Sequence, residues 1–181
     1  MDGTPLTAHS RAEIRLFCKA TLCPLCAKGP LEPLAPDEQS SQAGAHTAGV
    51  RVRCKACGEP SEFSFRLPPD PPSELSGELE IINPTEDPSR IIDVSQWITL
   101  YAVLYEEAAR TAAGPRKRLL ELQAGQCLDE ALKFFEDDQN DLPPASAFFD
   151  DSARLRLRDH PQEFSRQRLI SFRASLPRPL G

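Results

Sequence analysis

The sequence lacks the segments that membrane-spanning and secreted proteins need. No run of about 18 apolar residues occurs in its 181 residues. Met1 to Arg15 contains no apolar stretch of the kind that signal peptides carry. We therefore expect a soluble, intracellular and cytoplasmic protein without a membrane partner.

Motifs typical of enzymes are also missing. The chain has no GxxxxGK[ST] or GxGxxG phosphate loop, no HExxH and no GxSxG. It has three histidines, His9, His46 and His160, and none has an evident acid–base partner in the sequence. We expect a non-enzymatic protein with no catalytic residues. An active site assembled from scattered residues stays open as an alternative.

Proline, by contrast, is abundant, with 18 residues and a mean hydropathy of -0.40. This composition predicts turns and linkers between modest cores. The cysteines lie mainly in the first 57 residues and the long apolar periodicities after residue 93, so we expect two small domains, a β domain and then a helical one, in an α+β chain. The expected order is a flexible N-terminus at 1–12, a first domain at 13–67 with a mobile insertion at 35–48, a Pro-rich acidic linker at 68–92, a helical domain at 93–176 and a tail at 177–181.

Two cysteine pairs dominate the first domain. Cys23-Pro-Leu-Cys26 and Cys54-Lys-Ala-Cys57 are CxxC steps with 27 residues between them. Thiolates at this spacing can reach one tetrahedral ion from a tight turn, and two such turns supply the four sulfurs of a structural Zn²⁺ site. A closed shell of four sulfurs leaves no position for substrate or water, so we predict a zinc site that stabilises the fold.

Segments around these pairs favour strands. Val50 to Cys54 and Glu62 to Arg66 alternate with period two, and Glu13 to Phe17 suits a short strand as well. With these strands, the CxxC pairs resemble the zinc-ribbon superfamily with rubredoxin-like knuckles, over about residues 13–67. The resemblance implies β-hairpins whose tips grip one zinc. Gly58 follows the second knuckle as in that family, whereas Ala27 departs from the pattern after the first knuckle.

Two further cysteines need separate interpretations. Cys18 lies five residues before Cys23, so an exchange of metal ligand or a redox-sensing role stays open, although we prefer a strand residue. Cys127 falls on the apolar side of a predicted helix and is expected to act as a small hydrophobe.

The second half of the chain predicts a bundle of about four helices. Asp93-Val-Ser-Gln96 has the form of a capping box and begins a helix to about Ala113, and Gly114-Pro115 starts an antiparallel second helix to about 138. Shorter helices are expected at 151–159 and 161–175, with Phe148 and Phe149 in the core.

Charge is divided unevenly along the chain. Residues 62–93 hold eight acids against two arginines, whereas 152–181 hold seven arginines against Asp159 and Glu163. The leading hypothesis is a protein with a structural four-cysteine zinc site whose helical region binds a protein partner. The alternative is a nucleic-acid-binding zinc ribbon. It would use arginines of the C-terminal helices: Arg154, Arg156, Arg158, Arg166, Arg168 and Arg173.

Overall fold

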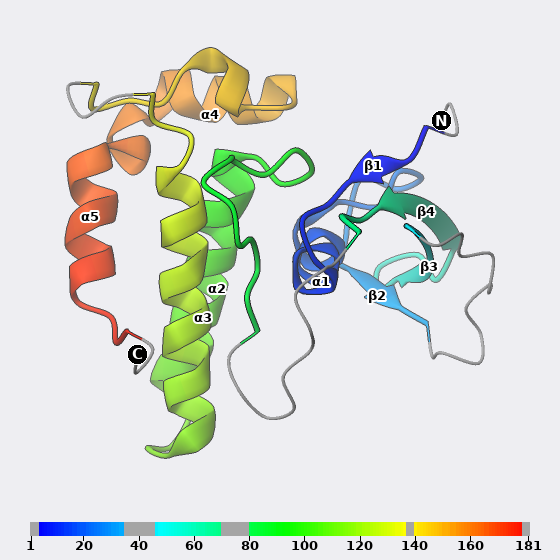
Figure 1. Cartoon of the computed structure of the whole chain (residues 1–181), viewed down its shortest axis with the longest axis horizontal. Coiled ribbons are helices and arrows are strands. Elements are labelled where there is room, and N and C mark those ends of the chain that lie inside the picture. Colours follow the sequence, from blue (N-terminus) through cyan, green and yellow to red (C-terminus); the bar gives the residue numbers. More distant parts are fainter. Residues whose placement is uncertain (1–3, 35–45, 70–79, 137–139, 179–181) are drawn as a thin grey trace. The chain divides into compact units, whose positions relative to one another are not determined.

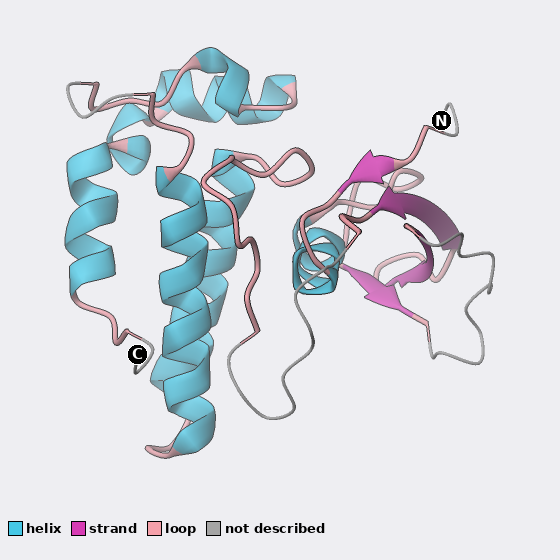
Figure 2. Cartoon of the chain, viewed as in Figure 1, coloured by secondary structure: helices cyan, strands magenta, loops and turns pink. Residues whose placement is uncertain are grey.

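The computed structural model describes residues 4–34, 46–69, 80–136 and 140–178. It confirms the α+β class, with a four-stranded sheet and one helix in the N-terminal part and the other helices after them (Figures 1 and 2). The chain divides into two compact units. The first contains the N-terminal part together with 80–85 and 89–92, and the second contains 86–88 and the chain from Asp93 onward.

The sheet of the first unit is mixed. Its strands are β1 (Leu6–Thr7), β2 (Leu31–Pro33), β3 (Thr47–Cys54) and β4 (Pro60–Arg66), in the order β1-β4-β3-β2. β1 runs parallel to β4, and the other two pairings are antiparallel. The strands predicted in 50–54 and 62–66 are therefore confirmed as parts of β3 and β4.

Helix α1 (Arg11–Ala20) occupies the segment for which a strand at Glu13–Phe17 was predicted, so that prediction is wrong. Five alternating residues fit either period, and the helix is selected by its start. Ser10 Oγ accepts a hydrogen bond from the backbone N–H of Glu13 at 3.0 Å. Ile14, Phe17 and Cys18 then face the core together.

The core of the first unit forms where α1 packs on the sheet. The Phe17 ring meets Phe63 and Phe65 edge to face, with ring centroids 5.3 and 5.4 Å apart. Val52 and Leu31 from the neighbouring strands are buried as well. This core is small, as expected for a unit that needs an additional source of stability.

Three predicted flexible stretches are in part packed. Residues 6–12 were predicted to be flexible but form β1 and the start of α1. Residues 47 and 48 of the predicted insertion belong to β3, because they pair with Arg66 and Phe65, and 35–45 lie outside the described residues. In the predicted linker, 70–79 also lie outside them, whereas Ile82 is buried and its carbonyl accepts a hydrogen bond from Ser10 Oγ at 2.5 Å.

In its described residues, the second unit contains four α-helices: α2 (Val94–Arg110), α3 (Pro115–Leu132), α4 (Asp151–Asp159) and α5 (Arg166–Ala174). α2 and α3 pack against each other, as the short connection predicts, and α5 packs along α3 (Figure 1). Leu100 and Leu104 of α2 and Leu120 and Leu128 of α3 are buried in this arrangement.

Three of the four predicted helix starts are confirmed. Asp93 and Gln96 form a capping box, Pro115 is the first residue of α3, and α4 begins at Asp151, directly after its cap Asp150. The last predicted helix is shorter than expected, because the 3₁₀ helix η3 (Pro161–Phe164) precedes Ser165, which caps α5.

Two details of the helical unit differ from the prediction. α3 ends at Leu132 instead of about 138, because the amides of Phe134 and Phe135 bond three residues back and tighten the turn. Phe148 is buried, whereas Phe149 is 44% exposed, so only the first of the pair is a core residue.

Candidate metal centre

Two short turns with the same backbone pattern carry the cysteine pairs. In the first knuckle, Cys23–Lys28, the Cys23 amide donates to the Lys28 carbonyl at 2.6 Å, and the Ala27 amide donates to the Cys23 carbonyl at 2.9 Å. In the second knuckle, Cys54–Glu59, the Cys54 amide donates to the Glu59 carbonyl at 3.0 Å and the Gly58 amide to the Cys54 carbonyl at 2.9 Å. The two knuckles therefore fold alike.

The residue after each second cysteine has a positive φ. Gly58 has φ 79°, a conformation that glycine adopts freely. Ala27 has φ 52°, in the left-handed region that costs about 1–2 kcal/mol for a residue with a Cβ. The first knuckle thus adopts the same left-handed turn as the second despite its alanine.

Strand pairing brings the knuckles side by side. The first knuckle leads into β2 and the second connects β3 to β4. Leu31 of β2 pairs with Cys54 of β3, and the Lys55 amide donates to the Pro30 carbonyl at 3.0 Å. The sheet therefore holds two cysteine pairs together that are distant in sequence.

The four sulfurs form one cluster. The Sγ atoms of Cys23 and Cys57 are 3.8 Å apart and those of Cys26 and Cys54 are 3.7 Å apart. All four Sγ atoms lie within 4.8 Å of one another. A tetrahedral ion with metal–sulfur bonds of about 2.3 Å requires sulfurs about 3.8 Å apart. The four predicted ligands are thus spaced to hold one metal ion.

Burial differs within the cluster. Cys23 and Cys54 are each 1% exposed, whereas Cys57 is exposed. The first cysteine of each knuckle therefore anchors the site to the core, and the second cysteines lie nearer to solvent.

The electrostatics of the cluster favour a cation. Hydrogen bonds from the backbone amides of Cys57 and Ala56 lower the pKa of Cys54 to about 7. At Cys57 the amide of Glu59 also lowers the pKa, but desolvation and the three neighbouring sulfurs outweigh it and raise the pKa to about 12. Four thiolates this close repel one another, and a bound divalent ion compensates that repulsion.

The remaining cysteines lie outside this cluster. Cys18 is fully buried in α1, and burial raises its pKa to about 11, so it is neither a ligand nor a reactive thiolate in this arrangement. Cys127 is fully buried in α3, in agreement with its predicted role as a small hydrophobe.

No protein-family model, curated protein sequence or solved structure matches this chain. Among the helices of the described residues, none combines the length and the apolar composition that a membrane span requires. The function of the cluster is therefore inferred from the positions of its four sulfurs and not from a related protein.

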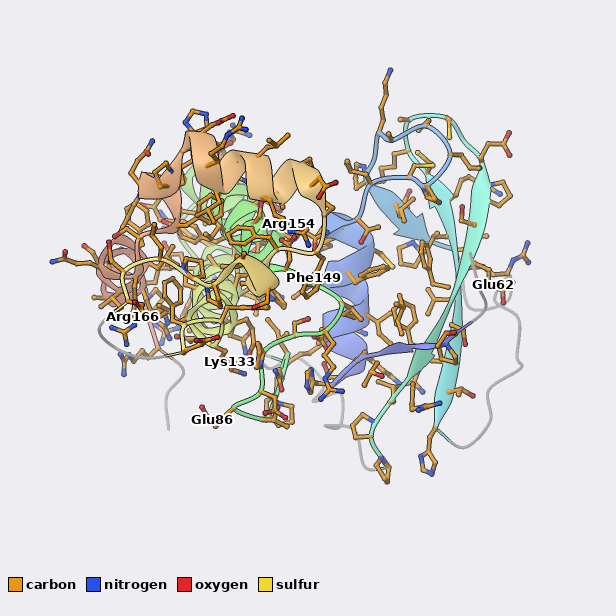
Figure 3. All side chains as sticks on the ribbon, turned by 90° about the horizontal axis from the view of Figure 1, so that it is seen from above. Glu62, Glu86, Lys133, Phe149, Arg154 and Arg166 are labelled. Carbon is orange, nitrogen blue, oxygen red and sulfur yellow. The ribbon has the colours of Figure 1, made fainter. Side chains whose placement is uncertain are left out.

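The arginines predicted to meet nucleic acid are mostly engaged within the helical unit (Figure 3, in which Arg154 and Arg166 are labelled). Four are bound to carboxylates: Arg154 to Asp151, Arg156 to Glu163, Arg158 to Asp159 and Arg173 to Asp129, at 2.7 to 2.8 Å. The Arg173 side chain is only 10% exposed. The amide of Arg166 donates to the Asp141 carbonyl at the start of α5. These contacts neutralise much of the local positive charge.

Sequence reasoning missed one buried carboxylate near the N-terminus. Glu13 is fully buried, and its carboxylate accepts a hydrogen bond from the backbone N–H of His9 at 2.5 Å and lies 3.2 Å from His9 Nδ1. Ser10-Arg-Ala-Glu13 has the spacing of a capping box, which was the available signal. This pair organises the start of α1.

Proposed function

We propose that this chain is a non-enzymatic, intracellular zinc-ribbon protein in which Zn²⁺ is structural and the helical unit binds a protein partner. The observation that carries the proposal is the four-sulfur cluster. An all-sulfur tetrahedral donor set favours zinc over hard cations such as Mg²⁺. Four thiolates complete the coordination shell, so the ion has no open position for a reaction.

Free thiols at these spacings also fit a reducing compartment, where paired cysteines bind metal in preference to forming disulfides. The hydrophobic core of the first unit is small and consists largely of phenylalanines. A bound metal would add stability that a core of this size does not supply alone. Both points support a structural role.

Support for a protein partner comes from the surface of the helices. Val103 on α2 is 58% exposed, and Leu155 on α4 and Ile170 on α5 are exposed as well. These side chains lie on three different helices, and exposed apolar carbon of this kind is what a protein partner can cover. Nucleic-acid binding is less well supported, because four of its six predicted arginines already pair with carboxylates.

The metal assignment is tested by zinc analysis of the purified full-length chain. We expect one zinc per chain, and less than about a tenth of that occupancy after Cys54→Ser, because three sulfurs leave the shell open. Cys127→Ala is the matched control, since this cysteine is distant in sequence from the knuckles and lies in the other compact unit. Full zinc occupancy in the Cys54→Ser variant would contradict the assignment.

Partner binding is tested with the same chain. A partner that associates with the wild-type protein should lose at least about tenfold in affinity with Val103→Glu, because a charge is placed in an apolar contact. Arg110→Gln, at an exposed ion pair on the same helix, is the control. Equal loss with both variants would indicate charge-driven association and contradict an apolar docking face.

A further inference from the structure

A cavity of about 210 Å³ lies within the helical unit, far in sequence from the four clustered cysteines. Its apolar wall comes from α2 and α5, and its charged groups come from α4, η3 and α5. The volume is below the roughly 300–1,000 Å³ of sites for drug-sized molecules, so it suits a ligand of fragment size. Among its lining residues are Ile98, Tyr101, Arg156, Arg168, Leu169 and Phe172.

Arg168 brings a charge to this cavity that no carboxylate neutralises within the described residues. There, its side chain donates one hydrogen bond, from Nη1 to the Gln162 carbonyl at 3.1 Å. The guanidinium lies over the Phe172 ring, 5.1 Å from the ring centroid. These contacts orient the exposed guanidinium and, within the described residues, leave Nε and Nη2 available to an anion.

Arg156 supplies a second, rigidly held guanidinium. Its Nε donates to the Glu163 carboxylate at 2.8 Å, and its Nη1 donates to the hydroxyls of Ser95 and Thr99 at 3.2 and 3.1 Å. Its Nη2 has no partner within the described part of the chain. The cavity therefore has two arginines and one acid, Glu163, on its lining, which leaves a net positive charge.

The rest of the lining is aromatic and aliphatic. Tyr101 stacks on Phe172 with ring centroids 5.7 Å apart and planes 25° apart. Ile98 and Leu169 complete the lining with aliphatic carbons. A ligand that fits this lining needs an apolar body as well as a negative charge.

We propose that this cavity binds a small organic acid, in which a carboxylate joined to a short apolar or aromatic body pairs with Arg168. Arginine suits a carboxylate because its planar fork can donate two parallel hydrogen bonds. The apolar body then covers carbon that would otherwise face water. This site is independent of the metal centre and adds a ligand class that the proposed function does not include.

The test is a titration of the full-length, metal-loaded chain with sodium benzoate, followed by amide chemical shifts in ¹H–¹⁵N spectra. We expect saturable shifts at α2 and α5 with a dissociation constant on the order of 1 mM, typical of a fragment. Benzyl alcohol has the ring without the charge, and acetate has the charge without the ring. Each should bind at least about tenfold more weakly than benzoate.

Variants identify the group that holds the carboxylate. Arg168→Gln should weaken benzoate binding at least about tenfold, because the amide keeps hydrogen-bonding capacity but loses the charge. Arg154→Gln is the matched control: Arg154 is paired with Asp151 and does not line the cavity, so benzoate affinity should stay within about twofold of wild type. Equal affinity for benzoate and benzyl alcohol, or Arg168→Gln binding as tightly as wild type with an unchanged unfolding midpoint, would overturn the proposal.

Discussion

The two compact units of this chain bury different kinds of side chain. The first unit has three phenylalanines, Phe17, Phe63 and Phe65, around one helix and a small sheet, and four cysteine sulfurs in one cluster. The helical unit buries Trp97, Phe148, Phe164 and several leucines, and its helices α2 and α4 begin at side-chain caps. The first unit therefore has the features of a metal-stabilised domain, and the second has those of a domain stabilised by packing.

The chain provides a convenient way to observe the two units separately. Its single tryptophan and both tyrosines, at positions 97, 101 and 105, all lie in the helical unit. Tryptophan fluorescence therefore reports the helical unit, whereas amide spectra resolve residues of both.

Metal removal should have the largest effect. Binding of structural zinc contributes an apparent ~10–16 kcal/mol in zinc-finger peptides at neutral pH, so chelation should unfold the first unit. Amide signals of β3 and β4 should lose their dispersion, while the Trp97 emission should stay unchanged. Loss of both signals at the same chelator concentration would show that the two units unfold together. It would contradict the idea that the metal stabilises only the first unit.

A truncation in the helical core should destabilise the helical unit and leave zinc binding by the first unit unchanged. Leu128 of α3 is fully buried, and Leu128→Ala should cost about 2–5 kcal/mol of unfolding free energy because it leaves a cavity. The denaturation midpoint measured by Trp97 fluorescence should fall, and the zinc stoichiometry should stay at the wild-type value. Leu119→Ala on the same helix is the control, because Leu119 is 39% exposed and its truncation should cost much less. A loss of zinc in Leu128→Ala would contradict independent units.

Removal of a helix cap in the second unit should have a smaller effect. Asp93 accepts hydrogen bonds from the amides of Gln96 at 2.8 Å and Phe149 at 3.1 Å, so it joins the start of α2 to a later loop. Asp93→Ala should cost about 2 kcal/mol, the upper end of the range for caps, because both amides lose their acceptor. Asp150→Ala, at the cap of α4, should cost less, since Asp150 is exposed and its bond to Ala153 is local. Equal thermal midpoints for the two variants would contradict this ranking.

The contribution of Asp93 to folding stability depends on pH, and the direction of its pKa shift gives the sign. Burial raises the pKa of Asp93 above its ordinary 3.8, although hydrogen bonds to Gln96 and Phe149 oppose the shift. The unfolded chain therefore ionises this group more readily, and the ionised form costs folding free energy above the raised pKa. That cost disappears as the pH falls through the raised pKa. The stability of wild type relative to Asp93→Asn should accordingly rise on acidification through the range just above 3.8.

Local signals made the helical half predictable from sequence. The capping box at Asp93 and the Gly114-Pro115 break each act within a few residues, and both are in place. The CxxC spacing likewise indicated which four sulfurs would meet. The side chains of the cavity could not be predicted, because Tyr101, Arg156 and Arg168 are brought together only by the packing of separate helices.

The first unit was less predictable for a different reason. The segment 13–17 is too short to separate a period of about 2.0 from one of about 3.6, and the spacing of Ser10 and Glu13 would have decided it. β1 has only two residues, and its partners in β4 lie almost sixty positions later in the sequence. No local pattern therefore predicts this strand or its pairing.

The smallest predicted effect compares the two knuckles themselves. Ala27 and Gly58 occupy equivalent positions, with φ of 52° and 79°, so a methyl group is tolerated at one position and absent at the other. Ala27→Gly should relieve the left-handed strain and stabilise the metal-bound chain by up to about 1 kcal/mol, since glycine's greater freedom in the unfolded chain offsets part of the gain.

Gly58→Ala should destabilise the metal-bound chain by about 1–2 kcal/mol for the same steric reason. An added Cβ at Gly58 would meet no atom within 4 Å, so its cost isolates the backbone conformation from any clash. The measurement is the chelator concentration at which half the zinc is lost, and it should rise for Ala27→Gly and fall for Gly58→Ala. Restoration of the wild-type midpoint in the double variant would show that the two knuckles are energetically equivalent supports of one ion. A midpoint governed by Gly58→Ala alone would instead make the second knuckle, which directly joins two strands, the dominant support.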